Sequence, residues 1–322
     1  MQRAKQGGLR REDAHIFAGA ARRNRNAVGG EGGVAHRELG EEHTPARIRA
    51  VLPHGGGDHI TQLRLALFDR ARAQRAFADY AAHYNTADPK VKLKIDHTYR
   101  VAALCGRIAE SLSLPQQDID LAWLSGILHD VGRFEQLRRY NTFIDAQSVS
   151  HAALSVSVLF DEGRIRDYLD DTDADSLLRA AVEWHSAFRL PDSLDERTQQ
   201  LCQILRDADK IDILRVNVET PMEEIYNVTT AQLRQSPVTP AVLDAFYEHH
   251  CVLHSLKKWP ADNAVGHASL VFELCYPESL RIVDAQGWLW RLLAFKTDNP
   301  DTAQAFEGIT AEMKRWLKAN GC

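Results

Sequence analysis

The chain has 322 residues, of which 44% are hydrophobic and 26% are charged, and its formal net charge is -5. These proportions are those of a soluble globular protein that can bury a stable core. The mild negative charge provides no basic stripe, so we expect no nucleic-acid partner. The sequence has no apolar run of the roughly 18 residues that a membrane-spanning helix needs, so we expect no membrane partner either.

The five cysteines are widely separated, and none of them belongs to a Cys-x-x-Cys pair. Such a dispersed, odd-numbered set is typical of reduced thiols rather than of a disulfide framework or a thiolate zinc site. The N-terminus contains arginine and lysine but lacks the apolar segment of a secretory signal. We therefore expect a cytoplasmic protein, and the composition leaves its oligomeric state open.

Residues 1–57 differ from the rest of the chain, because they are rich in glycine, arginine and glutamate and include glycine runs at 29–33 and 55–57. A segment of this composition buries too little apolar surface to offset the entropy that is lost on ordering. We interpret it as a flexible or non-native tail. Residues 58–322 are then expected to form one helical domain.

From Ile60 onward, apolar residues recur at the spacing of amphipathic helices. The predicted helices are, in chain order, 60–84, 91–112, 116–129, 150–160, 176–185, 196–214, a helix that begins at Thr220, 240–259, 264–274 and 302–319. Proline at 191 precedes the sixth of these helices, and Asn320-Gly321 ends the last one. The alternation typical of strands is absent, so the predicted fold class is all-α.

Histidine or aspartate occurs among apolar neighbours on five successive predicted helices. These residues are His97, His129 with Asp130, His151, His185 and Asp207. A single histidine on an apolar helix face is usually a core residue. Burying this many imidazoles and carboxylates is costly, however, unless they coordinate an ion or pair with one another. Imidazole nitrogen and carboxylate oxygen suit divalent transition metals, namely iron, manganese, zinc, cobalt or nickel.

The adjacent pair His129-Asp130 requires a particular backbone geometry. Neighbouring positions of a helix diverge by about a hundred degrees, so both side chains reach one ion most easily near a helix terminus. Gly132 follows the pair at once and offers a natural exit from the helix. This arrangement favours a ligand pair over an ordinary core position.

At these residues the sequence resembles the HD superfamily of metal-dependent phosphohydrolases. The family signature is a histidine, a His-Asp dipeptide at a helix end and a distal aspartate, which here are His97, His129-Asp130 and Asp207. The resemblance covers roughly residues 90–215, and the segment after the dipeptide is similar to an uncharacterised bacterial branch. It implies an HD-domain-like helical bundle with a metal core at about 90–215 and additional C-terminal helices at 216–322.

Two further histidines are similar to those of the dinuclear subgroup, in which they lie between the His-Asp pair and the last aspartate. The resemblance implies that the ligands of a first ion are His97, His129, Asp130 and Asp207. It implies that Asp130 bridges to a second ion, which His151 and His185 complete. One or two ions are therefore expected, and two of them would clamp the phosphoryl oxygens and lower the pKa of a bridging water.

Arg133 is the residue that we expect to contact the substrate phosphate and to support catalysis together with Asp130. The guanidinium fork matches phosphate oxygens, and the family often carries lysine or arginine at this position. Arg138 and Arg139, in the following loop, are expected to help, and a solvated basic face is the competing interpretation. The predicted reaction is hydrolysis of a phosphate ester or anhydride in a nucleotide or another small phosphorylated metabolite.

Two other functions stay open at this point. Some HD-fold proteins with the same six-ligand arrangement are diiron oxygenases, and ligand spacing does not separate their chemistry from hydrolysis. A non-catalytic nucleotide-sensing module is the other possibility, although all six positions carry competent ligand types. Alarmone hydrolases, deoxynucleotide triphosphohydrolases and cyclic-di-GMP phosphodiesterases do not fit, because the segments characteristic of each are missing.

Overall fold

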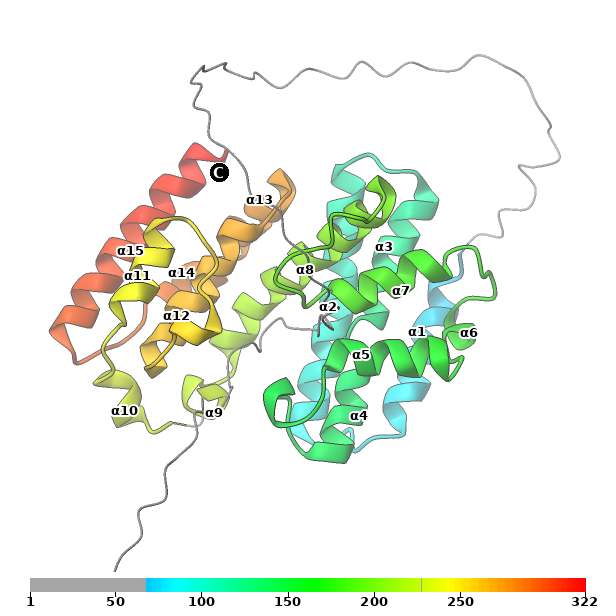
Figure 1. Ribbon diagram of the computed structural model, residues 1–322, viewed down its shortest axis with the longest axis horizontal. Helices are drawn as coiled ribbons and strands as arrows, with labels where there is room; N and C mark the ends of the chain where they lie inside the picture. Colours follow the sequence, from blue (N-terminus) through cyan, green and yellow to red (C-terminus); the bar gives the residue numbers. More distant parts are fainter. Residues whose placement is uncertain (1–67, 227) are drawn as a thin grey trace, which may run out of the picture. The chain divides into compact units, whose positions relative to one another are not determined.

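The computed structural model describes residues 68–226 and 228–322, and every regular element in these two ranges is a helix (Figure 1). The predicted all-α class is therefore confirmed. The interpretation of residues 1–57 as a tail lies outside the described residues, as does the first part of the predicted helix 60–84. None of the helices in the described ranges is both long and apolar enough to span a bilayer.

The first eight α-helices of the described chain are α1 (Arg70–Ala82), α2 (Pro89–Ser111), α3 (Gln116–Leu128), α4 (Val131–Tyr140), α5 (His151–Val156), α6 (Ile165–Tyr168), α7 (Asp175–Trp184) and α8 (Glu196–Glu219). Six of these eight helices correspond to predicted helices, whereas α4 and α6 were not predicted. Aspartate side chains accept backbone N–H groups at the starts of α1, α2 and α8, where such groups lack a partner within the helix. The short helix α5 continues into a π-helical turn, Ser157–Asp161.

The segment after the His-Asp pair differs from the prediction. We expected Gly132 to end a helix and a loop to follow, but α4 begins at Val131. Gly132 instead permits close packing, since a Cβ at this position would overlap the backbone nitrogen of Ser155 in α5. The Ser155 hydroxyl accepts the N–H of Gly132 and donates to the carbonyl of His129. The start of α4 is thereby held against α5.

The C-terminal extension consists of shorter helices. They are α9 (Met222–Tyr226), α10 (Thr230–Arg234), α11 (Pro240–Tyr247), α12 (Pro260–Ala268), α13 (Pro277–Gln286), α14 (Trp288–Leu293) and α15 (Pro300–Ala319). The predicted helix 240–259 ends earlier, at Tyr247, and His249 adopts a left-handed φ of 59°. The helices α10, α13 and α14 were not predicted.

The long helix α8 packs on two sides. It contacts α2, α3 and α7 of the preceding bundle, and it also contacts α12, α13 and α14 of the extension. The apolar side chains of Leu201, Leu205 and Ala208 are buried along it. Five charged residues of α8 are buried as well, and each needs a polar partner: Arg206, Asp207, Asp209, Lys210 and Asp212.

Candidate metal centre

Three ligand-type side chains from three helices form the first group. They are His97 in α2, His129 at the C-cap of α3 and Asp209 in α8, and their ligand atoms all lie within 4.8 Å of one another. The Nε2 atoms of His97 and His129 are 3.3 Å apart, and Nε2 of His97 is 3.2 Å from Oδ1 of Asp209. All three residues are buried.

The second group comprises Asp130, His151 and His185, whose ligand atoms also lie within 4.8 Å of one another. The Nε2 atoms of His151 and His185 are 3.0 Å apart, and Oδ1 of Asp130 is 3.6 Å and 3.8 Å from them. The helix α5 begins at His151, and α7 ends one residue before His185. Helix ends therefore bring this group together.

Asp130 stands between the two groups. Its Oδ2 atom is 3.7 Å from Nε2 of His97 and 3.5 Å from Nε2 of His129, while its Oδ1 atom faces the second group. The backbone of Asp130, at φ -111° and ψ 14°, joins α3 to α4 and is not helical. This bend lets two adjacent residues reach one centre, and a single carboxylate presents one oxygen to each group.

Each of the four histidines is oriented through its Nδ1 atom, which leaves Nε2 facing the centre. The Nδ1 partners are a carboxylate oxygen of Asp212 for His97 (2.6 Å), the carbonyl of Gly126 for His129 (2.8 Å), a carboxylate oxygen of Asp145 for His151 (2.7 Å) and the carbonyl of Val182 for His185 (2.7 Å). Such outer partners fix the tautomer and the ring orientation of metal-binding histidines.

At every residue of the two groups except His97, the electrostatics favour the protonation state that binds cations. Burial lowers the pKa of His129 and His151, and burial together with neighbouring imidazoles lowers the pKa of His185 to about 3. Burial alone would raise the pKa of Asp130, but Lys94 and other nearby positive charges hold it well below its usual value. Neutral imidazoles and an ionised carboxylate are the forms that coordinate metal ions.

The donor set fits divalent transition ions. Bonds of about 2.0–2.2 Å from an ion to nitrogen or oxygen place two ligand atoms roughly 3–3.5 Å apart. The facing Nε2 atoms are 3.3 Å apart in the first group and 3.0 Å apart in the second. Both groups are buried and contain only nitrogen and oxygen donors, so each can hold such an ion.

The prediction that Asp207 belongs to this centre is wrong. Asp207 and Asp209 are two positions apart on α8, so their side chains point about 160° apart, to nearly opposite faces. The fully buried carboxylate of Asp207 accepts the backbone N–H groups of Cys275 at 2.9 Å and of Tyr276 at 3.2 Å, just before α13. Asp207 therefore anchors the C-terminal extension, and Asp209 supplies the distal carboxylate.

Two aspartates of α8 were missed by the sequence analysis. Asp209 and Asp212 are three positions apart, share a helix face and both contact His97. Burial and Lys94 would lower the pKa of His97, but its hydrogen bonds with these two carboxylates raise it overall. Helical spacing was the available signal, because an aspartate three residues after Asp209 continues the same face.

Arg133 and the unpredicted Lys94 both lie beside Asp130. Nζ of Lys94 donates to Oδ2 of Asp130 at 2.7 Å, and Nε of Arg133 is 3.6 Å from Oδ1. Arg133 also donates to Asp145 at 2.9 Å, while its buried Nε has no hydrogen-bond partner. The ring of Phe143 is near both cations, with its centroid 5.7 Å from Nζ of Lys94 and 5.9 Å from Cζ of Arg133.

Arg138 and Arg139 lie within α4 rather than in a loop. Both donate to the carboxylate of Glu135 on the same helix, at 2.6 Å and 2.7 Å. Glu135 in turn accepts the hydroxyl of Tyr84. This placement favours the competing interpretation of the two arginines as a solvated basic face.

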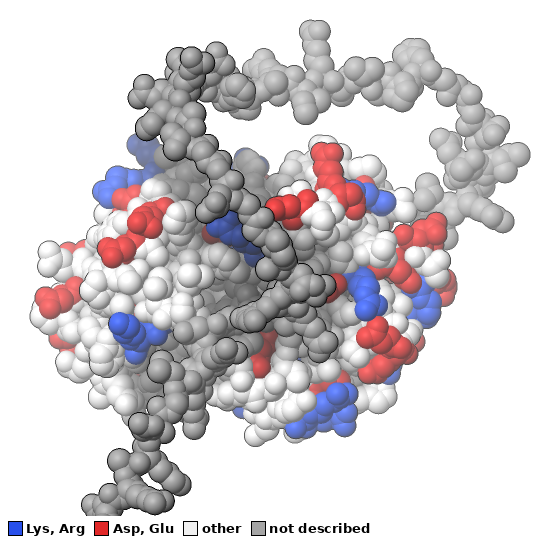
Figure 2. Space-filling view, viewed as in Figure 1, with Lys and Arg blue, Asp and Glu red and all other residues white. Residues whose placement is uncertain are grey.

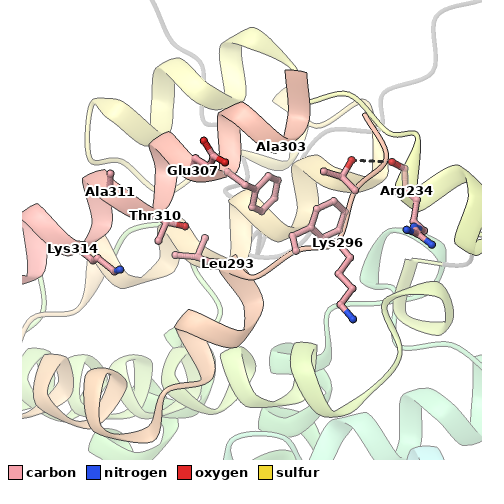
Figure 3. Close-up of a pocket in the computed structure, with 11 residues that line it drawn as sticks. Arg234, Leu293, Lys296, Ala303, Glu307, Thr310, Ala311 and Lys314 are labelled. Carbon is pink, nitrogen blue, oxygen red and sulfur yellow. Dashed lines mark hydrogen bonds between the residues drawn. The ribbon is translucent and has the colours of Figure 1, made fainter. Parts of the chain in front are cut away.

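A hollow of about 670 Å³ lies in the C-terminal extension, where Leu293, Thr310 and Lys314 are among the residues that line it (Figure 3). The rings of Phe295 and Phe306 stack beside it with centroids 4.8 Å apart. None of the residues that line this hollow belongs to either group. The hollow is therefore separate from the two buried His/Asp groups.

Comparison with known proteins points to the same region. The family model described as the HD domain matches residues 95–214, a range that contains all six residues of the two groups. No match was found among curated proteins or solved structures.

Proposed function

This chain belongs to the HD family through residues 95–214, and on that premise we propose that it is a metal-dependent phosphohydrolase. Its substrate is a phosphate ester or anhydride, in a nucleotide or another small phosphorylated metabolite. The observation that carries the proposal is the carboxylate of Asp130, which presents one oxygen to each imidazole group while two cations lie beside it.

Two divalent ions bound in such a site polarise phosphoryl oxygens and lower the pKa of a water molecule. The residues of this chain have complementary tasks. His97, His129 and Asp209 hold the first ion, and Asp130, His151 and His185 hold the second one. Lys94 and Arg133 place an ammonium and a guanidinium group where phosphate oxygens need positive charge.

Asp145 joins these two tasks. One of its carboxylate oxygens accepts from Arg133 at 2.9 Å, and the other contacts Nδ1 of His151 at 2.7 Å. A ligand of the second group and a phosphate-binding cation are thus fixed by the same side chain. We infer that Asp145 fixes the position of the substrate phosphate relative to the ion of the second group. Such positioning is the main requirement for phosphoryl chemistry.

The surface and the surroundings of the site support a small substrate. On the face drawn in Figure 2, basic side chains are interspersed with acidic ones, and no continuous basic stripe crosses the described residues in view. The ring of Phe143, next to Lys94 and Arg133, offers an apolar surface beside the phosphate position. A nucleotide has both features that this arrangement would recognise, an aromatic base and a phosphate.

The proposal predicts phosphate release that depends on metal and not on oxygen. Full-length protein stripped with a chelator is reloaded under argon with Fe²⁺, Mn²⁺, Zn²⁺, Co²⁺ or Ni²⁺ and supplied with nucleotides and sugar phosphates. We expect at least one ion to restore release of inorganic phosphate, because hydrolysis consumes only water. If the protein stays inactive with every ion under argon but forms product once oxygen is admitted, an oxygenase is correct instead.

The two cations beside Asp130 give a second prediction. Lys94→Met and Arg133→Ala should each lower kcat/KM about tenfold to a few hundredfold, as expected for the loss of one charged donor to a transition state. At saturating ion concentration the metal content per chain should be unchanged, because neither residue is a ligand. Arg139→Ala is the matched control, since this arginine binds Glu135, and it should keep full activity. Wild-type kcat/KM in both Lys94→Met and Arg133→Ala would assign the phosphate contact to other residues.

A further inference from the structure

Arg206 is a buried guanidinium whose partners are backbone carbonyls. It lies on α8, three residues before Asp209, and only 5% of its surface is exposed. It donates to the carbonyl oxygens of Trp184 (3.2 Å), His185 (3.4 Å), Phe188 (3.3 Å) and Ala187. Removing this side chain would leave several carbonyls without a partner.

The carbonyls of Trp184 and His185 lie at the end of the helix that leads into the second group, and those of Ala187 and Phe188 lie just after it. The helix α7 ends at Trp184, and His185 is its C-cap. The last carbonyls of a helix lack partners within it and carry partial negative charge, so a cation placed there is stabilising. Arg206 therefore fixes the backbone from which the His185 imidazole reaches the centre, while the contact between Nδ1 and Val182 fixes the ring.

A different arginine supports the first group. Arg100 donates to both carboxylate oxygens of Asp212, at 2.6 Å and 3.0 Å, and Asp212 contacts Nδ1 of His97 at 2.6 Å. Arg100 thus acts on His97 through a carboxylate, whereas Arg206 acts on His185 through the backbone. Arg100 therefore supports the first group and Arg206 the second, and the two arginines share none of these hydrogen-bond partners.

We infer that Arg206 is a positioning residue for the ion of the second group, and that the two ion sites are supported independently. The inference rests on the proposed function only in that both groups hold ions. Arg206 lies on the same helix as Asp209, so a general disturbance of α8 would affect the first group too. A selective effect on the second ion is therefore the specific expectation.

The test is a titration of metal-free, full-length protein with Mn²⁺, followed by calorimetry and by metal analysis of the dialysed product. His97→Ala and His185→Ala identify which binding step belongs to which group. Arg206→Met should weaken the step of the second group about 10- to 100-fold, the usual effect of losing an outer partner, and leave the other step unchanged. Arg100→Met should do the reverse. Arg206→Lys, which keeps the charge but lacks the fork, should lie between wild type and Arg206→Met.

Circular dichroism establishes that each variant is folded, and Arg206→Lys takes the place of Arg206→Met if the latter does not fold. Unchanged Mn²⁺ affinity at both steps, or equal weakening of both, overturns the inference. These outcomes are separable from failure of the proposed function. If wild-type protein binds two ions without releasing phosphate from any substrate, the hydrolase proposal fails while the role of Arg206 can still be read from the titration.

Discussion

Asp130→Asn is expected to reduce metal-dependent phosphate release by a factor of about 10³ or more. The amide keeps the size of the side chain but removes the negative charge that offsets two dications. It also replaces one of the two oxygens by an NH₂ group, which cannot coordinate an ion. One of the two groups therefore loses the oxygen that Asp130 presents to it. Turnover and bound metal per chain, measured on the same preparation, should fall together.

Asp262→Asn provides a matched control for the loss of a buried carboxylate. Asp262 accepts the backbone N–H and the hydroxyl of Thr239 in the C-terminal extension and belongs to neither group. This variant should be less stable but should bind metal and release phosphate normally. Undiminished turnover of Asp130→Asn at full metal content would be incompatible with the proposed mechanism.

The positions of most ligand-type side chains follow from helical periodicity. His97 shares one face of α2 with the buried Val101, Leu104 and Ile108, so the sequence already predicts that its imidazole points into the core. The same reasoning applies to His185, which shares a face of α7 with Leu178 and Val182. Where a helix has a single buried face, its apolar pattern is enough to place a polar residue on that face.

The helix α8 shows why this reasoning fails for the distal aspartate. It is buried against the preceding bundle on one side and against the C-terminal extension on the other. Its apolar residues therefore do not mark one inner face, and the sequence contains two buried acids within three positions. Choosing between Asp207 and Asp209 requires knowledge of which side each neighbouring helix occupies.

Contacts between helices explain the other differences. The glycine at position 132 looks like a helix exit in sequence, and only the close approach of α5 at Ser155 shows that it serves packing. Lys94 contacts Asp130, which lies 36 positions later in the sequence. Asp145 contacts His151, which lies 6 positions later. Nothing in their local sequence distinguishes them from surface charges.

The two acids of α8 provide the second large expected effect. Asp209→Asn should lower phosphate release by about two orders of magnitude or more, because it removes the one carboxylate that faces the first group alone and with it much of the affinity for one ion. Burial would raise the pKa of Asp209, but its hydrogen bond with His97 and the other nearby imidazoles lower it, so the carboxylate is ionised at neutral pH. Metal analysis should show one ion fewer per chain while circular dichroism stays helical.

Asp207→Asn makes the same chemical change two positions away, but it should lower the stability of the fold rather than the metal content or the activity. Its carboxyl group holds the backbone of Cys275 and Tyr276, so the loss is expected in stability, by about 1–3 kcal/mol for buried groups that lose a hydrogen-bond partner. Ion content and kcat/KM of the folded fraction should remain near the wild-type values. If Asp207→Asn instead loses an ion and Asp209→Asn keeps both, then Asp207 is the ligand and the metal centre lies on the opposite face of α8. Thermal unfolding together with metal analysis of both variants therefore decides which aspartate is the ligand.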